Sequence, residues 1–179
     1  MLKKSLKAKA GGGCVLHSYS QRTLPDYIRA LLHGQFVANC RGHVNYVGYG
    51  RRAIKTADLI IVSTRKAGDT LRSGRHRVEL CGFALLKIHE NELYVDIVCS
   101  SHRQGRVLLQ EAERKGRAMG KPLIKLSALP HVVSYYARLG YLESDNACDA
   151  SRPIRRSGNE WDGYRMTRCL GMKKAPSRS

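Results

Sequence analysis

A polar turn between a strand-like run and a helix-like run is the part of this chain best suited to bind an anion. It reads SSHRQGR over residues 100–106 and follows an apolar run. The first backbone N–H groups of a helix have no partner within the helix, so they can bind an anion. Gly105 lets the backbone approach a ligand closely, and Arg103 and Arg106 can add charge-assisted hydrogen bonds to a phosphate. The alternative is an ordinary turn without a ligand, since many such turns carry Gly and Arg.

A second glycine-rich stretch, GYGRRA over residues 48–53, fits the G-x-G-x-x-A pattern of a dinucleotide site. Such a site needs a strand before the pattern, a full crossover helix after it, and an acid about 20 residues further on. Asp69 is near that spacing, but the strand expected from Leu59 leaves too few residues for the helix. We therefore interpret the stretch as a glycine-rich turn that supports the fold or the substrate.

Residues 93–141 resemble the GNAT family, the Gcn5-related N-acetyltransferases. The family binds the acyl-CoA pyrophosphate at a Q/R-x-x-G-x-G/A turn between a strand and a helix. A further strand follows, and then a helix that ends in Tyr-x-x-x-Gly-aromatic. These elements occur in this order in LYVDIVCSSHRQGRVLLQEAERKGRAMGKPLIKLSALPHVVSYYARLGY, and YARLGY at 136–141 matches the ending. The resemblance is close over 93–141 and looser over the C-terminal two-thirds of the chain.

The phosphate turn departs from the family pattern. Aligned through Leu108, Ser100 takes the leading Gln/Arg position, Arg103 takes the first Gly position, and Gly105 alone is retained. A gap of one or two residues would instead align RQG at 103–105 with the family's loop. In either alignment, backbone amides carry the contact to phosphate. The residues that the resemblance implies for acetyl-CoA binding are Val98, Cys99, Ser100, Arg103, Gln104, Gly105 and Arg106.

The resemblance also implies the reaction, which is direct transfer of an acetyl group from acetyl-CoA to an amine on a small molecule or protein. Such an acyl-CoA-dependent N-acyltransferase needs a base for the amine, donors for the oxyanion and a proton for the leaving thiolate. Tyr136 is at the family's tyrosine position and is the expected proton donor; the alternative is an aromatic packed on an amphipathic helix. Asp96 is an acid within an apolar strand, and burial would raise its carboxyl pKa toward that of a base. The alternative for Asp96 is a structural acid.

The charge of the chain predicts anionic partners. The 179 residues include 32 Lys and Arg against 14 Asp and Glu, a formal net charge of +18. This excess favours contact with nucleic acid or another polyanion. The second functional hypothesis is therefore a catalytically degenerate GNAT-like basic module that binds nucleic acid or a nucleoprotein assembly. A solvated basic surface without a dedicated partner is the alternative to that contact.

The cysteines predict a reducing environment. Six cysteines are widely scattered, at positions 14, 40, 81, 99, 148 and 169, and none forms a CxxC pair. Disulfide frameworks are typical of shorter secreted chains, so we expect buried free thiols and a cytoplasmic location. We expect no metal site, because ligand-pair spacing is missing. We also expect no membrane span, because no apolar run approaches the ~18 residues required.

The hydrophobic pattern predicts one mixed α/β domain, with a central sheet flanked by helices as in GNAT proteins. We expect the domain over residues 14–170, between basic tails at 1–13 and 171–179. Strands are expected over 14–19, 59–63, 78–88, 93–99, 123–128, 141–142 and 161–169. Helices are expected from an N-cap at Thr23 to Gly34, over 104–119 and over 130–140. A polar loop is expected over 65–77 and a polar insertion over 144–160, while 35–56 shows no clear period.

Overall fold

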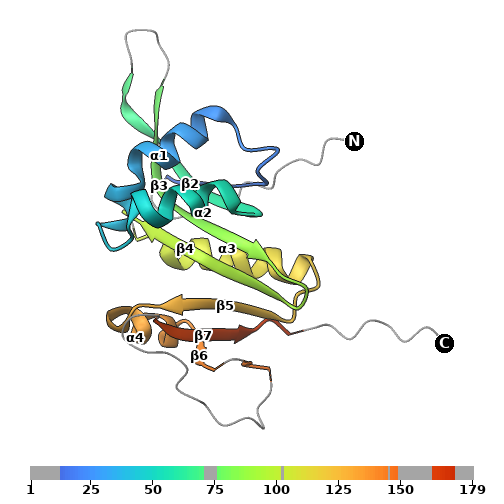
Figure 1. Cartoon of the computed structure of the whole chain (residues 1–179). Coiled ribbons are helices and arrows are strands. Elements are labelled where there is room, and N and C mark those ends of the chain that lie inside the picture. The colour runs from blue at the N-terminus through green and yellow to red at the C-terminus, as the bar shows by residue number, and fades with distance from the viewer. Residues whose placement is uncertain (1–12, 71–75, 102, 145, 149–162, 172–179) are drawn as a thin grey trace, which may run out of the picture. The chain divides into compact units, whose positions relative to one another are not determined.

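A computed structural model of the chain describes residues 13–70, 76–101, 103–144, 146–148 and 163–171 (Figure 1). Seven strands form one mixed sheet in the order β1-β2-β3-β4-β5-β7-β6. The strands are β1 (Val15–Tyr19), β2 (Leu59–Thr70), β3 (His76–Ile88), β4 (Glu92–Ser100), β5 (Leu123–Ala128), β6 (Leu142–Glu143) and β7 (Tyr164–Cys169). The helices are α1 (Asp26–Cys40), α2 (Arg51–Thr56), α3 (Gly105–Ala118) and α4 (Val133–Arg138), with a π-helix η1 (Tyr46–Gly50) and a 3-10 helix η2 (Pro130–Val132). The predicted α/β class is confirmed.

The chain divides into two compact units. Unit 1 is Met1–Leu86 with Ile97–Gln110, and unit 2 is Lys87–Asp96 with Glu111–Ser179. Strand β4 and helix α3 therefore contribute residues to both. The predicted tails lie outside the described residues except for Gly13 and Gly171, and so does most of the predicted insertion.

Unit 1 is built on the antiparallel strands β1, β2 and β3, with Ser18 opposite Ile61 and Val62 opposite Phe83. Helices α1 and α2 lie on the same face of these strands (Figure 1). Each large apolar side chain that is fully buried stabilises the fold by roughly 1.5–3 kcal/mol. The core between helices and strands contains Leu24, Ile28, Leu32, Phe36, Ile54, Ile60, Val62, Phe83 and Leu85.

Helix α1 is longer than predicted. Thr23 is not its N-cap, since the helix begins at Asp26 after Pro25, and the Thr23 hydroxyl accepts a hydrogen bond from the Ser20 N–H at 2.9 Å. Gly34 does not end the helix. The buried positions 28, 32, 36 and 40 continue one stripe at a spacing of four residues past it. Burial of this stripe outweighs the roughly 1 kcal/mol that a glycine costs within a helix.

The stretch GYGRRA at 48–53 forms η1 and the start of α2, so the predicted turn is helical. Helix α1, not a strand, precedes it, which excludes a dinucleotide-binding unit at this position. A side chain at position 50 would force the buried Phe36 ring to shift, since a Cβ there would lie 2.6 Å from Cζ of Phe36.

The hairpin of β2 and β3 extends further than predicted. Arg65 pairs with Glu79 and Thr70 with His76, so the expected loop at 65–77 is strand on both sides of residues 71–75, which are not described. The Arg65 Nε–Glu79 Oε2 distance of 2.8 Å marks a cross-strand ion pair. Apolar periodicity did not indicate these strand ends, because backbone pairing and a charge pair extend the hairpin there.

Unit 2 is built on β5, which pairs in parallel with β4 and antiparallel with β7. The parallel register runs over Glu92–Val95 and Leu123–Leu126. Strand β6 pairs with β7 on its other edge, one residue later than the predicted strand at 141–142. Within the described residues, no helix combines the length and apolar character that a membrane crossing requires.

All six cysteines are paired, so the expectation of free thiols is wrong. The disulfides are Cys14–Cys81 and Cys40–Cys99 in unit 1 and Cys148–Cys169 in unit 2. Their Cα–Cα distances are 6.9, 4.8 and 4.9 Å. Their partners lie 21 to 67 residues apart in sequence, which is why the scattered spacing gave no sign of them. The prediction of a cytoplasmic, reducing location was based on free thiols. The paired cysteines no longer support it, because disulfides persist in oxidising compartments.

Candidate active site

The polar turn after β4 is organised by its own side chains. The Ser100 hydroxyl accepts a hydrogen bond from the Gln104 N–H at 2.7 Å and thereby caps the start of α3. Arg103 has φ +54°, in the left-handed region that non-glycine residues seldom adopt. The cap and this left-handed residue bring the chain from the end of β4 to the start of α3 within four residues.

The turn is also fixed to the rest of unit 1. Ser101 donates its backbone N–H to the Cys81 carbonyl at 3.1 Å, and its hydroxyl lies 3.3 Å from Oδ1 of the buried Asn39. The Gln104 side chain is buried, and its Oε1 is 3.5 Å from the Ser63 hydroxyl. These contacts hold the turn from both α1 and β2, so its backbone N–H groups are set in place before a ligand binds.

The first turn of α3 carries backbone donors that have no acceptor within the helix. Gly105, Arg106 and Val107 occupy its first three positions, where N–H groups have no acceptor within the helix. The side chains of Arg103 and Arg106 are exposed beside them. Together with the helix dipole, this arrangement suits a doubly charged phosphate or pyrophosphate. The donor set thus fits the pyrophosphate of acetyl-CoA, although only one family glycine is retained.

The side chains of β4 alternate between buried and half-buried along the strand. The three β4 residues predicted to bind acetyl-CoA therefore differ in burial. Cys99 is buried and bound to Cys40 at the end of α1, whereas Val98 and Ser100 are half-buried. Strand β3 approaches very closely here, because a Cβ on Gly82 would lie 2.8 Å from both the Cys99 carbonyl oxygen and the Ser100 Cβ. Only glycine allows that approach, which fixes the end of β4 where the turn begins.

Tyr136 lies in α4 within unit 2 and is 8% exposed. Its ring contacts those of Tyr135 and Tyr141, with centroids 5.3 and 5.9 Å away. Burial, with a smaller effect of Tyr135, raises the pKa of the Tyr136 hydroxyl to about 12. The hydroxyl is therefore protonated throughout the physiological range. The Tyr136 ring therefore packs against other aromatic rings, as the alternative interpretation expects, and its hydroxyl is also a neutral hydrogen-bond donor.

Asp96 lies in unit 2 at the last position of β4 that belongs to that unit. Its side chain is half-buried, on the opposite side of the strand from the buried Val95 and Ile97. The apolar neighbours in the sequence suggested a buried carboxylate, but strand alternation directs them to the other face. Asp96 is therefore half-buried, although its neighbours in the sequence are buried.

The structure brings the seven predicted cofactor residues together in unit 1, and the two predicted catalytic residues belong to unit 2. Sequence reasoning missed the polar residues that support the turn, which are Asn39, Ser63 and Gln35. Gln35 accepts the Leu80 N–H at 2.9 Å through its side-chain oxygen, and its carbonyl accepts the Asn39 amide at 3.0 Å. The two amide side chains lie four residues apart, a spacing that places them on one face of a helix. The sequence did not indicate this shared face, because the helix was expected to end at Gly34.

Comparison with solved structures identifies the fold. An acyl-CoA N-acyltransferase from Pseudomonas aeruginosa superposes with a TM-score of 0.60 at 15% identity, over 87% of this chain and 99% of that one. Tetrahymena Gcn5 gives 0.57 at 8% identity, over 87% and 96%. The PaiA N-acetyltransferase of Thermoplasma acidophilum, solved with coenzyme A, gives 0.51 at 15% identity, over 87% and 98%.

The chain has the GNAT fold, as the sequence resemblance predicted. No family model matches the sequence, and no curated protein matches it. The similarity is therefore one of architecture, at identities where side chains diverge widely. The class that this architecture represents among its structural neighbours is the acyl-CoA-dependent N-acyltransferases.

Proposed function

We propose that this protein is an N-acetyltransferase that transfers an acetyl group from acetyl-CoA to an amine. The observation that carries the proposal is the turn at 100–106, where a capped helix start with two exposed arginines follows a strand of a GNAT fold. Acetyl-CoA supplies the acetyl group as a thioester, whose C–S bond breaks as the C–N bond to the amine forms. The acceptor is an amine on a small molecule or protein.

The N–H groups of Gly105, Arg106 and Val107 bind the pyrophosphate in this proposal, with the guanidinium groups of Arg103 and Arg106 beside them. The buried side chain of Gln104 fixes the start of the helix through its contact with the Ser63 hydroxyl. The backbone of Val98, Cys99 and Ser100, which follows the stretch of β4 paired with β5, binds the pantetheine arm and the acetyl carbonyl.

Tyr136 assists the departing thiolate. A thiol has an ordinary pKa of about 8.5, whereas the pKa of Tyr136 is raised to about 12. The phenol therefore holds its proton more tightly than the thiolate attracts it. In this proposal, Tyr136 stabilises the thiolate as a hydrogen-bond donor, and the proton itself comes from solvent.

Asp96 is proposed as the base that accepts the proton of the amine, directly or through water. Its half-buried side chain is accessible to water, which makes transfer through an ordered water compatible with its position. The test is amine-dependent release of free CoA by wild type and by Asp96→Asn. We expect kcat to fall with little change in acetyl-CoA affinity, and unchanged kcat would remove Asp96 from this role.

Acetyl-CoA binding is tested by calorimetric titration of the nuclease-treated protein. We expect one-to-one binding that Gly105→Asp weakens at least tenfold, because a carboxylate would face the pyrophosphate. Gly34→Asp is the matched control, since Gly34 is an exposed residue of α1 whose Cβ would contact nothing within 4 Å. If both variants bind as wild type does, the turn is not the pyrophosphate site.

The alternative function is a GNAT-like basic module that binds nucleic acid without catalysis. The observation that favours it is the retention of a single family glycine in the turn, together with the net charge of +18. It predicts no calorimetric signal for acetyl-CoA at millimolar concentration. Low-micromolar binding of acetyl-CoA would instead establish the cofactor site that the first proposal requires.

A further inference from the structure

A cluster of cations and tyrosines lies on η1 and α2 in unit 1. We call it the arginine–tyrosine surface, and its members are Tyr46, Tyr49, Arg51, Arg52 and Lys55. The Arg51 Cζ lies 5.3 Å from the centre of the Tyr46 ring, and the Arg52 Cζ lies 5.6 Å from the centre of the Tyr49 ring. Each guanidinium is thus placed over an aromatic face, a pairing that holds both groups in position.

The outer part of this surface faces solvent. Tyr49 is 38% exposed, and Arg51, Arg52 and Lys55 are exposed as well. Tyr46 is half-buried and anchored by a 2.8 Å hydrogen bond between its hydroxyl and Nδ1 of His33. The inner tyrosine therefore fixes the segment to α1, while the outer tyrosine is partly exposed to solvent.

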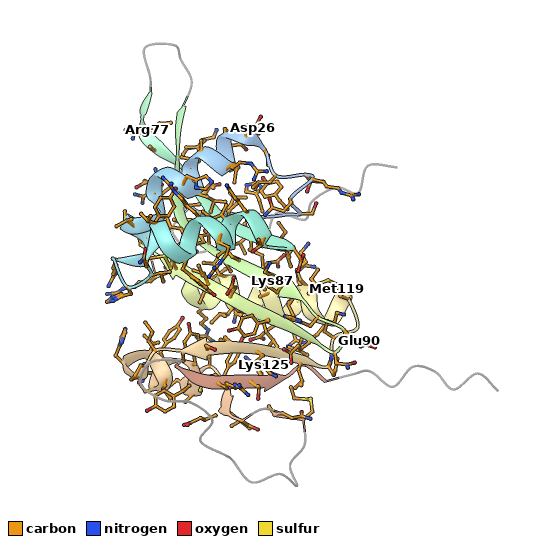
Figure 2. The ribbon with its side chains drawn as sticks, viewed as in Figure 1. Asp26, Arg77, Lys87, Glu90, Met119 and Lys125 are labelled. Atoms are coloured by element: carbon orange, nitrogen blue, oxygen red, sulfur yellow. A yellow bond between two sulfur atoms is a disulfide. The ribbon has the colours of Figure 1, made fainter. Side chains whose placement is uncertain are left out.

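The surface concentrates positive charge. The pKa of His33 is lowered by partial burial and by the nearby charges of Arg29, Arg51 and Lys55. Within the described part of the chain, no carboxylate forms an ion pair with Arg51, Arg52 or Lys55. Figure 2 labels Asp26 at the start of α1, and Asp58, just after α2, is the other acid in residues 13–66. The local cations outnumber these acids.

We propose that the arginine–tyrosine surface binds single-stranded nucleic acid. The exposed arginines and lysine attract successive phosphates, and an exposed tyrosine beside an arginine offers a plane on which a base can stack. A duplex hides its base faces, so Tyr49 gives it no advantage. Among residues 41–56, Val47 alone is a large aliphatic side chain that is exposed. This surface therefore offers little apolar area for insertion into a membrane. The surface shares no residue with the turn at 100–106, so the inference stands independently of acetyl transfer.

The test is fluorescence anisotropy of a labelled oligo-U RNA of about 20 nucleotides, longer than the ~4–16 nucleotides of an ordinary single-strand site. The full chain is titrated without acetyl-CoA at about 50 and about 200 mM KCl, where phosphate contacts weaken steeply with salt. We expect Tyr49→Ala to weaken binding about tenfold, in line with ~1–3 kcal/mol per stacked base. Tyr49→Phe keeps the stacking plane and should bind as wild type does.

A charge-matched pair of variants separates this surface from the general basicity of the chain. Arg51→Gln with Arg52→Gln should weaken RNA binding at least tenfold and reduce the slope of log K against log salt by about 1.4. Arg22→Gln with Arg138→Gln removes the same charge from exposed positions elsewhere and should change the affinity less than threefold. Circular dichroism confirms that each variant is folded.

Three outcomes would overturn the proposal. Equal weakening by both double variants would show that binding follows net charge alone. Duplex RNA that competes as well as oligo-U would remove the role of base stacking. Binding to phosphatidylserine vesicles that depends on Tyr49 and Arg52, without binding to RNA, would assign the surface to a membrane. Because no titration contains acetyl-CoA, a negative result leaves the proposed acetyl transfer intact.

Discussion

The Arg168 guanidinium of β7 is inserted against the buried carboxylate of Glu113 in α3, with Nη1 3.0 Å from Oε1. The Glu113 side chain is 5% exposed, and the same Oε1 also accepts the Tyr141 hydroxyl at 3.2 Å. Nη1 of Arg168 also donates to the Leu139 carbonyl at 2.7 Å. One buried carboxylate thus joins the helix α3, the strand β7 and the segment after α4.

Replacing Arg168 should destabilise the fold, because it leaves the Glu113 carboxylate buried without its closest cation. Breaking a buried pair costs roughly 3–5 kcal/mol, and partial exposure of Arg168 brings the expected loss for Arg168→Met to about 2 kcal/mol. Urea unfolding measures it, with the exposed Arg138→Met as control. A loss below ~0.5 kcal/mol would place this pair with ordinary surface ion pairs.

The hydroxyl of Tyr136 should matter for turnover and not for cofactor affinity. We expect Tyr136→Phe to lower kcat by about 100-fold, which is the lower end of what removing one hydrogen-bond donor to a developing negative charge costs. Tyr135→Phe, the neighbouring tyrosine on the same helix, should retain kcat. Steady-state rates and calorimetry on both variants distinguish the two effects. Full activity of Tyr136→Phe would leave that side chain with a packing role alone.

Burial of Tyr136 should also appear in alkaline unfolding. Its pKa is about 12 in the folded protein and about 10 in an unfolded chain. The folded state therefore holds this proton more tightly, and stability from the neutral phenol is complete below pH 10 and is lost as pH rises toward 12. Urea unfolding from pH 9 to 11.5 should show a steeper decline for wild type than for Tyr136→Phe. If the unfolding free energies of the two proteins fall in parallel with pH, the Tyr136 hydroxyl is solvated and not buried.

The close approach at Gly82 should link the fold to the cofactor turn. In Gly82→Ala the new Cβ would lie 2.8 Å from the Cys99 carbonyl oxygen, and a backbone atom cannot move aside cheaply. We expect a loss of about 1–3 kcal/mol and weaker acetyl-CoA binding, because Ser100 is displaced. Gly34→Ala should instead stabilise the protein by about 0.5–1 kcal/mol. Thermal unfolding with calorimetry checks both signs.

The disulfides should be detectable by thiol counting. Protein purified in air without reductant should show no reactive thiol when unfolded, since all six cysteines are paired. Cys40→Ser with Cys99→Ser opens a link between residues 59 apart, which the chain-entropy view values at about 4 kcal/mol. A lower Tm is therefore expected. Six titratable thiols in the unfolded wild type would restore the expectation of a reduced protein.

Much of the fold was predictable from local pattern. The strand at 93–99 and the helix at 104–119 carry strong periods, and the structure places β4 and α3 within one residue of them. The end of α1 was not predictable from a glycine signal, because Phe36 and Cys40 become buried only through tertiary contact. The disulfide partners were unpredictable as well, since pairing depends on positions that only the folded sheet brings together.

The candidate site was predicted in part. The turn at 100–106 could be singled out because the elements on either side of it resemble the GNAT family in the right order, since a glycine and two arginines alone also occur in ordinary turns. The supporting amides of Gln35 and Asn39 were hidden, since their partners lie more than 40 residues away in sequence. The half-buried position of Asp96 could not be read from its apolar neighbours, because those residues face the other side of the strand.

The disulfide at Cys99 has a kinetic consequence for the proposed enzyme. Its sulfur is bonded to Cys40 within the very strand proposed to bind the thioester, and the other four cysteines are paired too. No thiol of this chain is therefore free to take up the acetyl group as an acyl-cysteine. A route through an acyl-cysteine is thereby excluded, and the direct transfer proposed above predicts that initial-rate plots at several fixed acetyl-CoA concentrations intersect and do not run parallel.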